Sequence, residues 1–493
     1  MTKKVMIVTG EASGDLHGAG VIRALRRRIN NLQVSGMGGT ELASCGVEIL
    51  CDAEKVSVVG VFEVFAHLGN ILAAQRMLRR RLKADPPDLL LLIDLPDFNL
   101  LLAKCARKIG IPVFYYITPQ VWAWRSGRVQ TIKARVDQLA VILPFEEAYF
   151  QDRGVAARYV GHPLLDSVRP GITPAQFREI HHIPATTEII GLLPGSRRRE
   201  VTTLLPVMLL AAEELQRGTA TPLLFCIPRA TTITREFLNQ FCQVSKGTID
   251  ILVIDDHRYS LMAACRAVVA ASGTVTLELA ILGVPMVVVY RLSLLSYLLG
   301  RMLIKLDHFS LVNLIAGFQA VPELLQDEVK PGAICQALGE LFSEGERRAA
   351  TLDALALVRK RLGEPGAADR VAEMILALLA KSPEAEAQPA EELEQVVIAP
   401  GPLLDLHHFS PKELATLVPD FLEECQENGI FEVRIIHGKG SGQLRRSVHA
   451  LLERNPRVAD FHSAALQNGD WGATEVLLKR PSTPGEEDHQ IGQ

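Results

Sequence analysis

Short aliphatic runs alternate along the chain with longer segments whose apolar residues recur at helical spacing. Aliphatic runs without polar alternation are typical of parallel strands that are buried on both faces. The alternation of such strands with helices therefore predicts an α/β protein with a doubly wound sheet. The first series of predicted strands is Val5–Val8, Leu89–Ile93, Val113–Tyr116 and Leu139–Leu143.

A second series of aliphatic runs begins near Glu188. Two series in tandem predict two Rossmann-like lobes that face a cleft, with a boundary within Asp166–Pro184. Two helical segments, Glu346–Leu362 and Ala367–Leu379, are expected to close this unit. The predicted strands of the second series are Ile189–Leu193, Leu223–Ile227, Ile251–Ile254, Ala267–Ala270 and Pro285–Tyr290.

The segment Ser382–Pro400 is rich in Pro, Ala and Glu and lacks aromatic residues, which indicates a solvated linker. After it the pattern predicts strand Leu403–Leu406, helix Pro411–Asn428, strand Phe431–Ile436, helix Gly442–Arg454 and strand Thr474–Leu478. We therefore expect a first lobe at 1–170, a second at 171–380, a linker at 381–400, a small α/β domain at 401–480 and a disordered tail at 481–493.

Composition narrows the classes of function only slightly. The 493 residues carry a formal charge of -4, which gives no global reason to expect a polyanionic partner. The eight cysteines include no C-x-x-C pair, so we expect reduced, buried thiols and no metal site. The N-terminus has no signal-peptide pattern, and the apolar segment Leu292–Leu306 contains Arg301 and Lys305. A cytoplasmic protein, soluble or peripheral to a membrane, is expected.

Polar, small-residue segments follow several predicted strands, where ligands bind in open α/β sheets. In the first lobe these are Gly10-Glu-Ala-Ser13-Gly-Asp15 and Asp94-Leu-Pro-Asp97-Phe-Asn99. A carboxylate there could deprotonate a sugar hydroxyl, although a capping role for either aspartate is equally compatible with the pattern.

Two segments of the second lobe are typical of phosphate sites. Gly195-Ser196-Arg197 places a small turn and a guanidinium at the start of a predicted helix, although a solvated basic face would give the same pattern. Ser272-Gly273-Thr274 opens another helix, with Glu278 one turn deeper among apolar residues. Because an unpaired buried charge is costly, Glu278 is expected to have a polar partner such as ribose hydroxyls.

Together these segments resemble the lipid-A-disaccharide synthase family over about residues 3–380. Further shared motifs are Pro119-Gln-Val-Trp122-Ala-Trp124-Arg125, Gly161-His162-Pro163 and Ser310-Leu-Val-Asn313-Leu. The resemblance implies a GT-B fold without a metal or other cofactor. It also implies inverting transfer of 2,3-diacylglucosamine from UDP to the 6-hydroxyl of 2,3-diacylglucosamine 1-phosphate (lipid X).

The resemblance also implies roles for particular residues. Asp97 is the candidate general base with Asp94 as the alternative, and Ser13 and Asp15 would shape the acceptor side. The UDP-sugar side would comprise Gly195, Ser196, Arg197, Ser272, Gly273, Thr274, Glu278 and Asn313. The chain departs from the expected pattern at Phe318-Gln319, where a basic residue is expected.

Acylated substrates imply contact with the cytoplasmic face of the inner membrane. The segments Val58–Phe65 and Leu292–Leu306 are candidates for that contact, although a buried core helix or a homodimer helix would give the same pattern.

Residues 403–479 resemble the Smr domain. Leu404-Asp405-Leu-His407 and His437-Gly438-Lys439-Gly440-Ser-Gly carry the likeness, and they imply a nucleic-acid site at Asp405, His407, His437, Gly438, Lys439 and Gly440. His408 stands where the family usually has glycine, and an inactive interaction module is an equal alternative.

Two alternative functions of the whole chain remain. It could be another UDP-N-acetylglucosamine enzyme of GT-B fold, such as the peptidoglycan N-acetylglucosaminyltransferase or an epimerase. It could also be a nucleic-acid-binding or nicking protein that acts through the Smr domain.

Overall fold

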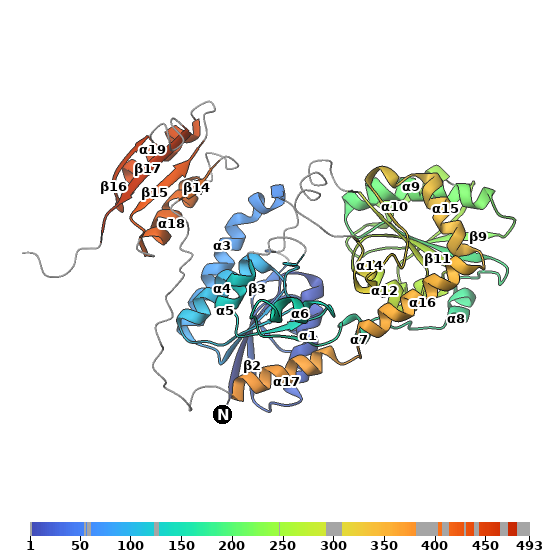
Figure 1. Cartoon of the computed structure of the whole chain (residues 1–493), viewed down its shortest axis with the longest axis horizontal. Helices are drawn as coiled ribbons and strands as arrows, with labels where there is room; N and C mark the ends of the chain where they lie inside the picture. The colour runs from blue at the N-terminus through green and yellow to red at the C-terminus, as the bar shows by residue number, and fades with distance from the viewer. Residues whose placement is uncertain are drawn as a thin grey trace, which may run out of the picture. The chain divides into compact units, whose positions relative to one another are not determined.

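The computed structural model describes residues 2–53, 56, 61–122, 128–245, 247–291, 308–380, 403–406, 414–427, 430–437, 443–463 and 472–480. It divides into two compact units, Met1–Glu384 and Ala385–Gln493 (Figure 1). The apolar segment 292–306, the linker and the tail lie outside the described residues, as do residues 58–60 and the side chains of 61–65. None of the described helices is both long and apolar enough to cross a bilayer.

The first lobe is built on a seven-stranded parallel sheet in the order β3-β2-β1-β4-β5-β6-β7. All five residues of the central strand β4 are aliphatic and buried, which is the pattern of a strand covered on both faces. The strands are β1 Lys3–Val8, β2 Leu32–Gly38, β3 Glu48–Asp52, β4 Leu89–Ile93, β5 Val113–Tyr116, β6 Gln138–Val141 and β7 Ala157–Tyr159.

Helices cover both faces of this sheet and form two separate cores. One core joins the sheet to helix α1 and the returning helix α17, and the other joins it to α3, α4 and α5. The helices are α1 Ala12–Arg26, α2 Thr40–Ser44, α3 Val61–Ala84, α4 Pro96–Lys108, α5 Arg128–Arg135, α6 Glu146–Gln151, α7 Leu164–Ser167 and α17 Ala367–Ala380.

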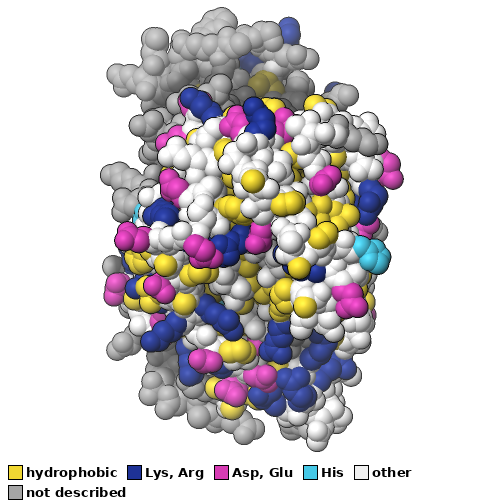
Figure 2. Space-filling model, turned by 90° about the vertical axis from the view of Figure 1, so that its right-hand side faces the viewer, with side chains coloured by type: hydrophobic (Ala, Val, Ile, Leu, Met, Phe, Trp, Pro, Cys, Tyr) yellow, Lys and Arg dark blue, Asp and Glu magenta, His cyan; other side chains and the backbone are white. Residues whose placement is uncertain are grey.

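The second lobe repeats the plan with a six-stranded parallel sheet in the order β10-β9-β8-β11-β12-β13. On the face of this lobe shown in Figure 2, apolar side chains are interspersed among charged ones. The strands are β8 Glu188–Leu193, β9 Leu223–Pro228, β10 Asp250–Ile254, β11 Ala267–Ala271, β12 Met286–Tyr290 and β13 Glu323–Leu325. The helices are α8 Pro174–Ile180, α9 Arg198–Arg217, α10 Arg235–Cys242, α11 Arg258–Ala264, α12 Thr274–Leu282, α14 Leu311–Ala316, α15 Pro331–Phe342 and α16 Glu346–Arg361, with 3-10 turns at Gln243–Ser245 and Gln326–Glu328.

The chain passes between the lobes twice, and the two passages are bonded together. After α16, which packs on the second lobe, the chain returns to the first lobe, where α17 lies against α1 (Figure 1). The backbone N–H of His162 donates to the carbonyl of Leu362 at 3.1 Å. The carboxylate of Asp166 accepts from the N–H of Gly366 at 2.7 Å and caps α17.

The third domain has a four-stranded mixed sheet in the order β14-β15-β17-β16. β14 is parallel to β15, and β17 is antiparallel to both of its neighbours. β16 was not predicted, because its exposed residues lack an aliphatic run. The elements are β14 Leu403–Asp405, α18 Leu414–Glu427, β15 Glu432–Ile436, α19 Gln443–Arg454, β16 Val458–Ser463 and β17 Ala473–Leu478.

The described cysteines form no disulfide. Cys226, Cys265 and Cys425 are buried as expected, whereas the other five are partly exposed.

Candidate functional site

In both lobes the predicted residues, apart from Asn313 in α14, follow strands at the topological switch point of a sheet. β1 and β4 are neighbours although the chain runs from β1 outward to β3 before it reaches β4. β8 and β11 have the same relation in the second sheet. Ligands of doubly wound proteins bind outside the carboxyl ends of such a strand pair, where the two connections diverge. The segments at 10–15 and 94–99 follow the first pair, and those at 195–197 and 272–274 follow the second.

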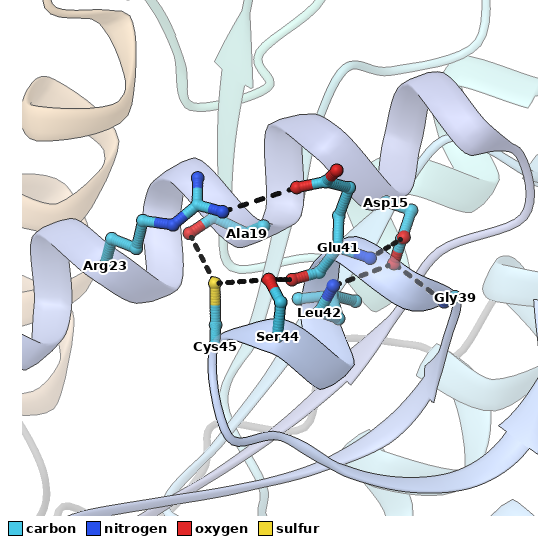
Figure 3. A network of polar contacts seen from close by, with 8 residues as sticks. All are labelled: Asp15, Ala19, Arg23, Gly39, Glu41, Leu42, Ser44 and Cys45. Carbon is cyan, nitrogen blue, oxygen red and sulfur yellow. Dashed lines mark hydrogen bonds and ion pairs between the residues drawn. The ribbon is translucent and has the colours of Figure 1, made fainter.

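Asp15 is a buried anchor for the neighbouring loop, as Figure 3 shows. Its carboxylate accepts hydrogen bonds from the backbone N–H of Gly39 at 2.7 Å and of Glu41 at 2.8 Å, and a longer one from Leu42 at 3.4 Å. These amides open α2, so Asp15 satisfies a helix N-terminus from another element. Ser13, by contrast, is exposed on the first turn of α1.

The turn after β4 has an unusual backbone. Asp94 and Leu95 have positive φ angles of 54° and 45°, and Ile117, at the end of the neighbouring β5, has φ of 57°. Non-glycine residues rarely adopt this region, and such strain concentrates at functional sites. The carbonyl of Asp94 accepts from the side-chain amide of Asn99 and the hydroxyl of Tyr115, each at 2.6 Å, which holds the turn in place.

The two candidate bases differ in their surroundings. Burial and the nearby carboxylate of Glu11 raise the pKa of Asp94. Asp97, on the first turn of α4, has a side chain that is 76% exposed and forms an ion pair with Arg128. Asp97 is therefore the more accessible of the two, and Asp94 is the more buried.

Trp122 marks a contact that the sequence did not reveal. Its indole N–H donates to the carboxylate of Glu146 at 3.0 Å, and its ring packs edge-on against Phe145. The carboxylate also accepts from the backbone N–H of Leu143 at 3.0 Å and of Ile142 at 3.3 Å. Burial raises the pKa of Glu146 to about 7 despite these donors. Residues 123–127, which include Trp124 and Arg125, lie outside the described part of the chain.

At the start of α9, a carboxylate of the chain itself already accepts from the backbone N–H groups of the predicted phosphate site. The carboxylate of Glu200 accepts from the backbone N–H of Ser196 at 3.0 Å and of Arg197 at 3.2 Å. Gly195, with φ of 109°, leaves the space that Glu200 fills. The guanidinium of Arg197 is 59% exposed and lies 3.7 Å from Glu200.

The start of α12 is open in comparison. Gly273 and Thr274 are exposed, and a β-carbon placed on Gly273 would meet no atom within 4 Å among the described residues. One turn deeper, Glu278 is buried, and its carboxylate pairs with the guanidinium of Arg258 and accepts from the hydroxyl of Tyr259 at 3.3 Å. The partner that a buried glutamate requires thus comes from α11, twenty residues away in the sequence.

Asn313 is a fully buried anchor in this structure. Its amide donates to the carbonyl of Val321 at 2.9 Å and to the carboxylate of Glu323 at 2.8 Å, and its oxygen accepts from the N–H of Val321 at 2.9 Å. It thereby holds the loop that contains the exposed residues Phe318 and Gln319. Direct contact of Asn313 with a ligand remains a prediction.

A polar cluster occupies one end of the sheet in the third domain. The hydroxyl of Thr474 lies 2.9 Å from Nε2 of His437 and 3.0 Å from Nε2 of His449. Arg445, one turn before His449, donates to the hydroxyl of Ser463 at 3.0 Å. Strand register brings the end of β14, and with it Asp405, to this same end of the sheet.

The sequence identified only part of this cluster. His407, Gly438, Lys439 and Gly440 lie outside the described residues, and for Asp405 only the backbone is described. His449 and Thr474 were missed because their contact depends on the pairing of strands that are distant in the sequence.

Comparison with known proteins gives two family matches in the chain. The family model described as Lipid-A-disaccharide synthetase matches residues 5–375, and that of the Smr domain matches residues 404–479. The lipid-A-disaccharide synthase of Geobacter sulfurreducens is 43% identical over 77% of this chain and 98% of its own length. That of Syntrophus aciditrophicus is 45% identical over 77% of this chain and 99% of its own length.

Two solved structures share the fold at low sequence identity. MurG of Acinetobacter baumannii has a TM-score of 0.50 at 17% identity and covers 76% of this chain and all of its own. The UDP-GlcNAc 2-epimerase of Neisseria meningitidis, bound to UDP-GlcNAc, has a TM-score of 0.50 at 14% identity and covers 77% of this chain and all of its own. The two lobes of this chain therefore have the architecture of GT-B glycosyltransferases.

Proposed function

The chain belongs to the lipid-A-disaccharide synthase family of hexosyltransferases, and we propose that it transfers 2,3-diacylglucosamine from UDP to the 6-hydroxyl of lipid X. The observation that carries this proposal is that four of the family's motifs, at 10–15, 94–99, 195–197 and 272–274, follow the strand pairs at the two switch points. We assign residues 1–170 to the acceptor lobe, 171–380 to the UDP-sugar lobe, 381–400 to a linker and 401–480 to the Smr domain.

For the diphosphate we propose the start of α12 as the main site. The N–H groups of Thr274 and Val275 donate to no described residue, whereas those of Ser196 and Arg197 donate to Glu200. Helix N-terminal N–H groups without partners favour an anion. The exposed guanidinium of Arg197 would add charge-assisted hydrogen bonds as the leaving group gains charge.

On the acceptor side we propose Asp97 as the general base. It would take the proton of the 6-hydroxyl as that oxygen attacks the anomeric carbon and the bond to UDP breaks. Asp94 is the alternative base. Asp15 would then act as a positioning residue, because its carboxylate accepts from backbone amides.

The proposal predicts UDP release from UDP-diacylglucosamine only when lipid X is present. Asp97→Asn should lower kcat by about a hundredfold or more with little change in KM, because a base acts in the transition state. Asp94→Asn is the matched comparison. A wild-type chain that releases no UDP contradicts the function, whereas an undiminished rate in Asp97→Asn removes only the assigned base.

We also propose that the enzyme works at the cytoplasmic face of the inner membrane, because both proposed substrates carry acyl chains. Vesicle flotation of the wild type and of a Leu295→Ser, Leu298→Ser, Leu299→Ser variant tests this. Equal flotation of the two folded proteins would exclude that segment as the contact.

For the third domain the His437–Thr474–His449 cluster favours binding of a nucleic-acid phosphate, with Arg445 supplying charge. Arg445→Gln should weaken binding of the full chain to structured RNA or plasmid DNA. Arg480→Gln, at the opposite end of the sheet, should not. Absence of both a mobility shift and nicking by the wild type at low salt would contradict this role.

A further inference from the structure

Glu278 is the one residue of the proposed nucleotide site that is both charged and buried in an apolar helix. Its eight companions in α12 are six aliphatic residues and two threonines, Thr274 and Thr276, near the helix start. Such a carboxylate stays in place only if hydrogen bonds replace the water it loses. Its orientation therefore depends on the groups that pair with it.

Those groups are two neighbouring residues of α11. Arg258 pairs with Oε2 of Glu278, and the hydroxyl of Tyr259 bonds Oε1 at 3.3 Å. The guanidinium of Arg258 also lies 4.6 Å from the centre of the Tyr259 ring, within the range of a cation–π contact. The three side chains thus form one connected unit.

The backbone that carries Arg258 and Tyr259 is itself fixed. His257, immediately before the helix, has a positive φ of 56°, which turns the chain into α11. The hydroxyl of Ser260 accepts from the backbone N–H of Ile172 at 3.2 Å and ties α11 to the segment between the lobes. α11 also packs against α12.

These contacts leave Glu278 able to bind a diol. An ionised carboxylate offers about four lone-pair directions, and Arg258 and Tyr259 occupy one on each oxygen. Two adjacent hydroxyls, such as those of a ribose, require two more acceptor directions with a fixed separation. A carboxylate held at both oxygens is preorganised for that pair, since its rotation is already restricted.

We propose that Arg258 and Tyr259 are positioning residues that orient Glu278 toward the ribose hydroxyls of the nucleotide. This inference rests on the proposed UDP-sugar function and assigns two residues that the family motifs quoted above do not include. The competing explanation is an ion pair that only keeps α11 and α12 together, which would affect all nucleotides equally.

Calorimetric titration of the full chain with UDP and with 2′-deoxy- and 3′-deoxy-UDP separates these explanations. We expect the wild type to bind UDP about tenfold more tightly than at least one deoxy analogue, the size of one charged hydrogen bond. Arg258→Gln should lose that preference while binding the analogue as the wild type does. Tyr259→Phe should lose part of it, and Arg258→Lys should restore part of it.

Arg235→Gln is the matched control, because Arg235 forms an ion pair with Asp255 in the same lobe and does not contact Glu278. Equal weakening of UDP and both analogues in Arg258→Gln overturns the inference and leaves the function intact. Unchanged binding of UDP by Arg258→Gln would also overturn the inference and leave the function intact. A wild-type chain that binds none of the three nucleotides overturns both proposals.

Discussion

The partners of a carboxylate decide what each acidic residue of this chain can do. Asp15 and Glu200 accept from backbone amides and so serve as helix caps, whereas Asp97 pairs with one arginine and stays exposed. Glu146 is a third kind, because it is buried and its partners among the described residues are three N–H donors and no cation. Burial then dominates, and its pKa rises to about 7.

Glu146→Gln should therefore change how stability depends on pH. Because folding raises the pKa of Glu146 from 4.5 to about 7, the folded chain binds this proton more tightly than the unfolded chain. That contribution is complete below pH 4.5 and is lost as the pH rises through 7, a change on the order of 3 kcal/mol. The variant lacks it, so its melting temperature relative to the wild type should rise between pH 5 and pH 8.

Glu147→Gln is the control, because Glu147 is partly exposed. Thermal melts of the three proteins at several pH values would show the difference. Parallel curves for Glu146→Gln and the wild type would contradict the assignment.

At the scale of elements, the aliphatic runs predicted the central strands to within two residues at either end, because strands buried on both faces need continuous apolar sequence. Edge strands such as β3 and β13 were not predicted, since their residues are only partly buried and lack a continuous apolar run. The sequence indicated which residues belong to the candidate site, but it did not indicate which of them contact one another. Nothing local to Glu278 points to Arg258, and nothing local to Asp15 points to the amide of Gly39.

The start of α9 gives a prediction of its own. A β-carbon on Gly195 would lie 2.2 Å from Oε2 of Glu200, and the φ angle of 109° is unfavourable for other residues. Gly195→Ala should therefore expel Glu200 from its two amides and destabilise the chain by about 1–3 kcal/mol. Gly218→Ala, at the other end of α9 with φ of -84° and contacts of 3.5 Å, should have little effect. Equal melting temperatures for the two variants would show that the cap at Glu200 is dispensable.

At the scale of the whole molecule, the transferase and the third domain are separate compact units. The relatives from Geobacter sulfurreducens and Syntrophus aciditrophicus align over 98% and 99% of their own length with 77% of this chain. Nearly the whole length of those relatives thus aligns with a part of this chain that is about as long as the first unit.

A chain that ends at residue 384 should accordingly fold and keep the kcat and KM of the full protein in the transferase assay. Its melting transition should coincide with the corresponding transition of the full chain, because separate cores unfold separately. A truncated protein that aggregates, or whose kcat falls tenfold, would show that the third domain supports the transferase.

The bonds from His162 to Leu362 and from Asp166 to Gly366 have a mechanical consequence. Two connections at separate places would restrict relative motion of the lobes, whereas two connections that are hydrogen-bonded to each other form a single hinge. We expect relative motion of the lobes to be a rotation about that hinge. Since α17 packs on α1, the C-terminal end of the described part of this unit moves with the first lobe when the second lobe turns.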